Sequence, residues 1–139
     1  MKVFALPLAL ALAVPVVVAA SGPKHPSLSI KATPAMAFSP AHVVITADLR
    51  GGANDDEQFY CPAIEWEWGD GTTSDNSADC EPYQPGKTEI TRHFTVDRMF
   101  PHAGEFRVQL RLKKENKVIA SATTLVRVRP GISDGGGLP

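Results

Sequence analysis

The chain has 139 residues, 43% of them hydrophobic, and a formal net charge of −1 at pH 7. This length suits one domain, and the near-neutral balance argues against a nucleic-acid-binding protein. The charge is nevertheless uneven, because residues 48–81 hold ten acidic residues and one basic residue, whereas residues 87–129 hold ten basic and four acidic residues. Such an asymmetry can orient partners, although two solvated faces of one small domain are the commoner explanation.

The first twenty residues have the pattern of an export signal. Met1-Lys2 is a short basic start, residues 3–20 are almost wholly apolar, and Val18-Ala19-Ala20 supplies the small residues at which signal peptidase cuts. We therefore predict a cleaved signal peptide over residues 1–20, a flexible leader over residues 21–27, and a secreted or cell-surface protein. An uncleaved anchor is the alternative, since the apolar run approaches the ~20 residues that a membrane span needs.

Short segments of alternating or β-branched residues follow, separated by Pro, Gly and polar stretches. The expected strands are residues 28–31, a Pro-interrupted edge segment over 34–40, then 42–49, 63–68, 90–100, 106–113 and 118–128, with at most one weak strand in the polar region 72–87. Ile90, Phe94 and Val96 can share one strand face. No segment has a sustained helical period, so we predict an all-β antiparallel β-sandwich of about seven strands.

The last two expected strands are the clearest part of the pattern. Phe106, Val108, Leu110 and Leu112 alternate with polar residues, and the polar pair at 115–116 precedes the final strand. These strands should therefore form an antiparallel hairpin. Residues 130–139 are Gly-rich and without periodicity, which predicts a disordered tail.

The most informative motif is Trp66-Glu67-Trp68-Gly69-Asp70-Gly71. It predicts a strand with both indoles on one face, where they fill the space between two sheets. The strand ends in a tight turn, in which the glycines permit backbone angles denied to other residues and Asp70 can accept hydrogen bonds from backbone amides. A second motif consists of Phe100, Gly104 and Phe106.

Together these motifs resemble the hallmark of the polycystic-kidney-disease (PKD) domain family. The family pattern is Trp-x-Phe-Gly-Asp-Gly, with Trp68 here in the Phe position, and the family has the same downstream spacing as Phe100, Gly104 and Phe106. The resemblance implies an immunoglobulin-like β-sandwich over residues 28–129, of a kind associated with protein–protein and protein–carbohydrate contacts. Two features depart from the family, because Arg98 stands where His is frequent and the stretch 79–97 is longer than usual.

Cys61 and Cys80 are the only two cysteines. Export makes a disulfide between them the expectation, and reduced thiols the alternative, while the spacing matches no zinc site. The bridge would close a loop of about twenty residues and stabilise the fold by roughly 3 kcal/mol. It differs from the inter-sheet bridge of antibody domains, since Cys61 precedes Trp66 by only five residues. We expect it to hold the long loop beside its own strand.

No convergent set of groups indicates catalysis. The histidines are scattered (His25, His42, His93 and His102), no Gly-x-Ser-x-Gly motif occurs, and Glu65 and Glu67 have the spacing of ordinary surface carboxylates on one strand face. We predict a non-enzyme with no catalytic residues, no cofactor and no metal. Structural calcium stays an alternative, because the loops hold many oxygen ligands. These are Asp55, Asp56, Glu57, Asp75, Asn76, Asp79 and Glu81.

Four arginines form the candidate binding face. Arg107 and Arg111 lie on one expected strand, and Arg127 and Arg129 lie on its hairpin partner, so all four should project from the same sheet face. Such a face can bind an anionic glycan or an acidic protein, although a solubilising exterior is commoner. We therefore predict a secreted or surface-exposed non-catalytic module that binds an extracellular protein or glycan and no nucleic acid. The alternative is a structural, self-associating component of a cell-surface assembly, joined through exposed edge strands.

Overall fold

Strands dominate the computed structural model, which describes residues 15–16 and 25–132. Within these residues the strands are β1 (Ser27–Thr33), β2 (Met36–Phe38), β3 (Ala41–Arg50), β4 (Ala63–Glu67), β5 (Thr73–Asn76), β6 (His93–Phe100), β7 (Gly104–Lys114) and β8 (Lys117–Arg129), and the 3-10 helix η1 spans Glu57–Phe59. The predicted signal peptide apart from residues 15–16, the leader up to residue 24, and residues 133–139 of the predicted tail lie outside the described residues.

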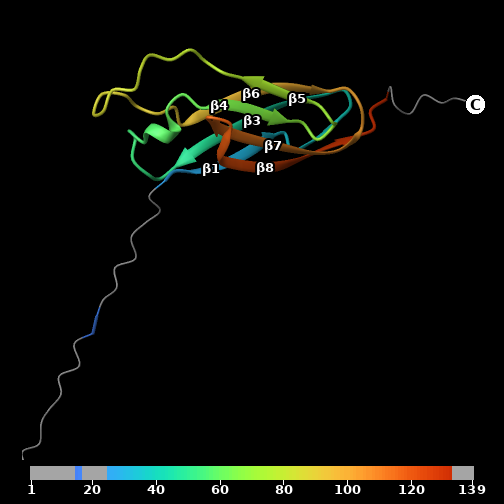
Figure 1. The fold of residues 1–139 in the computed structure, drawn as a ribbon. Helices are drawn as coiled ribbons and strands as arrows, with labels where there is room; N and C mark the ends of the chain where they lie inside the picture. The colour runs from blue at the N-terminus through green and yellow to red at the C-terminus, as the bar shows by residue number, and fades with distance from the viewer. Residues whose placement is uncertain (1–14, 17–24, 133–139) are drawn as a thin grey trace, which may run out of the picture.

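The strands form two sheets, in the order β1-β3-β6 and β2-β8-β7-β4-β5 (Figure 1). Adjacent strands are antiparallel except for β2, which runs parallel to β8. If β1 to β8 are taken as strands A, A′, B, C, C′, E, F and G, this is the immunoglobulin arrangement, with A, B and E in one sheet and C, F and G in the other. The fold is immunoglobulin-like, as predicted, and the eighth strand is the weak one that the polar region 72–87 allowed.

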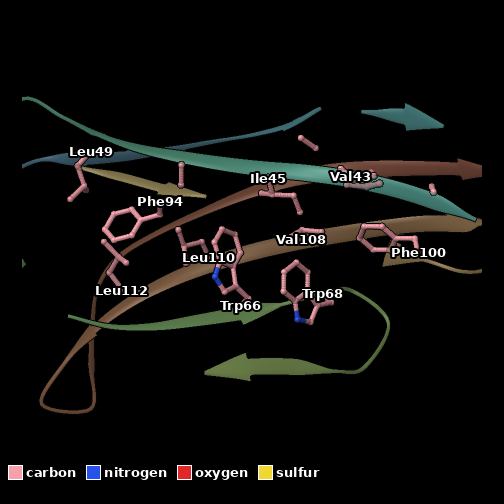
Figure 2. Close-up of a cluster of buried hydrophobic side chains, with 14 of the residues drawn as sticks. Val43, Ile45, Leu49, Trp66, Trp68, Phe94, Phe100, Val108, Leu110 and Leu112 are labelled. Atoms are coloured by element: carbon pink, nitrogen blue, oxygen red, sulfur yellow. The ribbon is translucent and has the colours of Figure 1, made fainter. Parts of the chain in front are cut away.

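The core lies between the sheets because the strands alternate buried and exposed residues. Val43 and Ile45 of β3 face Val108 and Leu110 of β7, and all four are fully buried (Figure 2). Burial of such side chains contributes roughly 25 cal/mol per Å² of apolar surface. The described residues contain no helix that is long and apolar enough to cross a membrane.

Both tryptophans of the sequence motif lie in this core, as predicted. Trp66 and Trp68 stack with their ring centroids 5.6 Å apart and an interplanar angle of 11° (Figure 2). The indole nitrogen of Trp68 donates a hydrogen bond of 2.8 Å to the hydroxyl of Ser74 on β5. The buried indole is therefore fixed in orientation as well as packed.

The Gly69-Asp70-Gly71 turn joins β4 to β5. Gly69 and Gly71 have φ angles of 80° and 87°, in the left-handed region. A Cβ on Gly69 would lie 2.6 Å from the backbone nitrogen of Arg107, whereas a Cβ on Gly71 would meet nothing within 4 Å. The Asp70 carboxylate accepts a 2.9 Å hydrogen bond from the backbone N–H of Thr72, as the motif predicts.

Two expected elements differ in detail. The strand predicted over residues 90–100 begins only at His93, although Ile90 is buried and donates its N–H to the carbonyl of Asn54 at 2.9 Å. The single weak strand expected in the polar region is β5, an edge strand with all four residues exposed. The segment between Pro34 and Pro40 also lies at an edge, as β2.

Cys61 and Cys80 form a disulfide. It joins the residues before β4 to those after β5, so that it closes the open end of the β4–β5 hairpin. Tyr60 and Tyr83 hold the same region, with ring centroids 5.7 Å apart and each phenol donating to a backbone carbonyl, of Glu81 and Asp55 respectively. The long polar loop is thus held beside its own strand, as expected.

Candidate binding surfaces

The structure places the four arginines of the predicted binding face on the outer face of the five-stranded sheet. Along β7 the buried residues alternate with outward-facing ones that include Arg107 and Arg111. Along β8 the same alternation turns Arg127 and Arg129 outward. Cross-strand register puts Arg107 opposite Leu125, on the same face. Their ionic surroundings, however, differ.

Arg111 is neutralised by the neighbouring strand β4. Its two terminal nitrogens donate 2.7 Å hydrogen bonds to Glu65 and Glu67, and Glu65 also pairs with Lys113. Hydrogen bonds, first from Lys113 and then from Arg111, lower the pKa of Glu65, and the bond to Glu65 raises the pKa of Arg111. Glu65, Glu67, Arg111 and Lys113 therefore form a cross-strand ion-pair network that holds β4 to β7.

The other three arginines lie nearer the β2 end of the sheet. Arg127 pairs with Glu105 at 3.4 Å, and the Nε of Arg129 lies 3.3 Å from the sulfur of Met36. Arg107 makes no ion pair with any described residue. These arginines keep most of their hydrogen-bonding capacity for solvent or a partner.

Exposed apolar side chains lie beside them, and sequence reasoning missed these residues. Met36 and Phe38 of β2 pair in register with Arg127 and Arg129, and are 54% and 67% exposed. The sequence did carry a signal for them, because Met36 and Phe38 flank the half-buried Ala37 and therefore lie on the opposite, exposed face of β2. We call Met36, Phe38, Arg107, Arg127 and Arg129 the β2–β8 patch.

A lateral groove of about 480 Å³ opens between β5 and β6, the edge strands of the two sheets. Ile64, Trp66 and Trp68 line it from within, and residues 74–76 and 93–98 form its walls. In Figure 2, the side chains of Trp66, on β4, and Trp68, just after it, point into the core. The groove thus reaches the core from the side of the sandwich.

Arg98 closes one part of this groove. Its Nη2 donates 3.1 Å hydrogen bonds to the Asp70 carboxylate and the Thr72 hydroxyl, and its guanidinium carbon lies 4.6 Å from the ring centroid of Trp68. Hydrogen bonds from Thr72, with a smaller contribution from Arg98, lower the pKa of Asp70. The residue that departs from the PKD pattern therefore links β6 of one sheet to the Gly-Asp-Gly turn of the other.

Three of the four histidines contact one carboxylate each. His25 lies 2.8 Å from Asp56, and His42 lies 3.8 Å from Asp97. His93 lies between Asp48 at 2.8 Å and the Thr95 hydroxyl at 2.9 Å, on the outer face of the three-stranded sheet.

The structure gives no support for the calcium alternative in the described part of the chain. No group of three or more His, Cys, Asp or Glu side chains there is arranged to hold a metal ion. Asp56, one of the candidate ligands, already accepts a 3.1 Å hydrogen bond from the backbone of Gln58 at the start of η1.

Comparison with known proteins gives only distant structural similarity. No protein-family model matches the sequence, and no curated protein matches it. Two solved structures of the CARDB domain of the PF1109 protein from Pyrococcus furiosus are similar, each 16% identical in sequence. The crystal structure, in complex with di-metal ions, has a TM-score of 0.46 and covers 78% of this chain and 97% of that chain. The solution NMR structure has a TM-score of 0.47, with 75% and 94% covered.

Proposed function

We propose that this chain is an exported, non-catalytic recognition module of PKD-like type, and that it binds an extracellular protein through the β2–β8 patch. One observation carries the proposal. Exposed Met36 and Phe38 lie on the same sheet face as three arginines, Arg107, Arg127 and Arg129. Aromatic residues, Met and Arg are the residue types enriched in the centres of protein interfaces.

The PKD assignment is supported by the positions of the motif residues, which match those expected from the sequence. The tryptophans pack between the sheets and the Gly-Asp-Gly run forms the β4–β5 turn. Export is supported by the apolar N-terminal sequence and by the disulfide between Cys61 and Cys80, because disulfides persist in oxidising compartments.

A protein partner fits the patch better than an anionic glycan does. A glycan chain would need a continuous basic surface, but Glu65 and Glu67 neutralise Arg111, and Glu105 faces Arg127. Exposed Phe38 and Met36 instead offer apolar area that a protein segment can bury. We therefore expect a partner that presents acidic residues around an apolar centre.

Asp48, His93 and Thr95 form a chain of hydrogen bonds, and its exposure to solvent supports a binding role rather than catalysis. This order of groups is used in acyl transfer, but the His93 and Asp48 side chains are 62% and 45% exposed on an open sheet face. Water has free access there, whereas catalytic sites exclude it.

A photo-crosslinking experiment tests the proposal. p-Benzoylphenylalanine in place of Phe38 should crosslink one protein from the native extracellular fraction, and the same residue in place of exposed Lys31 on β1 serves as the control. Arg127→Gln together with Arg129→Gln should reduce the adduct. Equal labelling from both positions would contradict the proposal. Heparin retention that is lost in the Gln variant, with no protein adduct, would favour the glycan instead.

A further inference from the structure

Strand β6 has an unpaired edge. It forms a ladder only with β3, and no described residue outside β3 bonds to its backbone. In immunoglobulin constant-type domains a strand D lies at this position, but residues 77–92 contain no strand here. An exposed edge of this kind is a template for an added strand.

The direction of the free backbone groups follows from the ladder. Leu49 of β3 donates its N–H to the carbonyl of Arg92 at 2.8 Å, so the backbone of residue 92 points toward β3. Because this direction alternates along an antiparallel strand, Phe94 and Val96 also bond toward β3. The N–H and C=O groups of His93, Thr95 and Asp97 therefore point outward, away from the sheet.

We propose that a second copy of this chain pairs with β6, antiparallel, about a two-fold axis at Thr95. Thr95 then lies opposite its own counterpart, His93 lies opposite Asp97 of the second copy, and Phe94 lies opposite Val96 of the second copy. Opposite residues share a sheet face, so the His–Asp pairs lie outside and the apolar pairs lie inside, at the mouth of the lateral groove. The free groups of residues 93, 95 and 97 supply about six backbone hydrogen bonds.

Neighbouring registers are less complementary. An axis at Val96 places Phe94 against Arg98 of the second copy, and an axis at Asp97 places the two Asp97 carboxylates opposite each other. An axis at Phe94 leaves Val96 opposite Arg92. Only the Thr95 register combines His–Asp pairs on the outer face with apolar pairs on the inner one. The interface is separate from the β2–β8 patch, which lies on the five-stranded sheet, whereas β6 is an edge of the three-stranded one.

Thiol crosslinking tests the register. The chain has no cysteine beyond the disulfide pair, so Thr95→Cys introduces a single thiol. Hydrogen-bonded cross-strand partners lie about 5.5 Å apart at Cα, within the range that a disulfide spans. Thr95→Cys should form a covalent dimer under mild oxidation, whereas Thr123→Cys, exposed on the other sheet, should stay largely monomeric. Unchanged melting temperatures show that both variants fold.

Sedimentation measurements test the association of the unmodified chain. The wild-type protein should dimerise, and Asp97→Arg should weaken the dimer about tenfold because it removes two cross-strand His–Asp pairs. Glu89→Arg, in an exposed loop, is the matched control and should have no effect. Equal crosslinking of the two Cys variants, or a wild-type monomer up to about 1 mM, would overturn the proposal. Crosslinking of Thr95→Cys to a different protein would overturn it in favour of a foreign strand.

Discussion

The two glycines of the Gly-Asp-Gly turn should respond very differently to alanine. Both have left-handed φ angles, which cost a residue with a Cβ about 1–2 kcal/mol. For Gly71→Ala this is the main cost, since a Cβ there meets nothing within 4 Å. Reduced entropy of the unfolded chain offsets part of it, leaving a net loss of about 1 kcal/mol.

Gly69→Ala carries the same backbone cost and a steric one. Its Cβ would lie 2.6 Å from the backbone nitrogen and 2.8 Å from the backbone oxygen of Arg107, which belongs to β7 in the middle of the five-stranded sheet. Arg107 pairs with Leu125 of β8, so these backbone atoms can move only with the strand. Overpacking of this kind costs typically 1–3 kcal/mol, so the total loss should be about 3 kcal/mol.

Urea unfolding, followed by tryptophan fluorescence, measures the free energy of unfolding of both variants, because Trp66 and Trp68 are buried in the folded state. The melting temperature of Gly69→Ala should lie about 10 °C below that of Gly71→Ala, for a domain of this size. Unfolding free energies within about 0.5 kcal/mol of each other would refute the reasoning, because Arg107 would then not be the rigid neighbour that the structure shows.

Four further predictions follow from the contacts around this turn and the loops. Replacing both Cys61 and Cys80 by Ser should lower the free energy of unfolding by roughly 3 kcal/mol in urea, and a loss near zero would mean that the hairpin end is already fixed by other contacts. Arg98→Gln should cost roughly 1–2 kcal/mol in the same assay, because the indole beneath it loses its cation contact and Asp70 loses an ionic partner. Asp70 and Glu65 have lowered pKa values in the folded protein, so the stabilisation from their ionised forms is present above the unfolded-state pKa values and is lost as the pH falls through the folded ones. Unfolding free energy measured against pH should therefore decline below about pH 4, and less steeply in Asp70→Asn. Addition of EDTA should leave the melting temperature measured by calorimetry unchanged, and a clear drop would restore the calcium hypothesis.

The sequence allowed the sandwich to be predicted because its strands alternate strongly and its turns carry their own signals. β7 and β8 are the best case, since alternation gives both their inner faces and their pairing. The sequence signal for β5 is weak because all four of its residues are exposed, so no hydrophobic pattern marks the strand. Ile90 is buried through a loop contact with Asn54, which periodicity cannot reveal.

The candidate surface was only partly accessible to the same reasoning. Alternation is a local property, so it correctly put the four arginines on one face. Neutralisation of Arg111 depends on β4 being the neighbour of β7, which is a property of the sheet order. The β2–β8 patch likewise depends on β2 pairing with a strand about ninety residues away.

The edge strands β2 and β6 show why the two proposed surfaces differ in kind. At β2, flanking prolines and a length of three residues leave little backbone to pair, so recognition there falls to the side chains of Met36 and Phe38. β6 is longer, and its one inward-pointing charge, Arg98, lies near its end over Trp68. An inward charge discourages strand addition, and so Arg98 confines pairing to residues 93–97. That interval is centred on Thr95, the same residue at which the side-chain complementarity of a second copy is best.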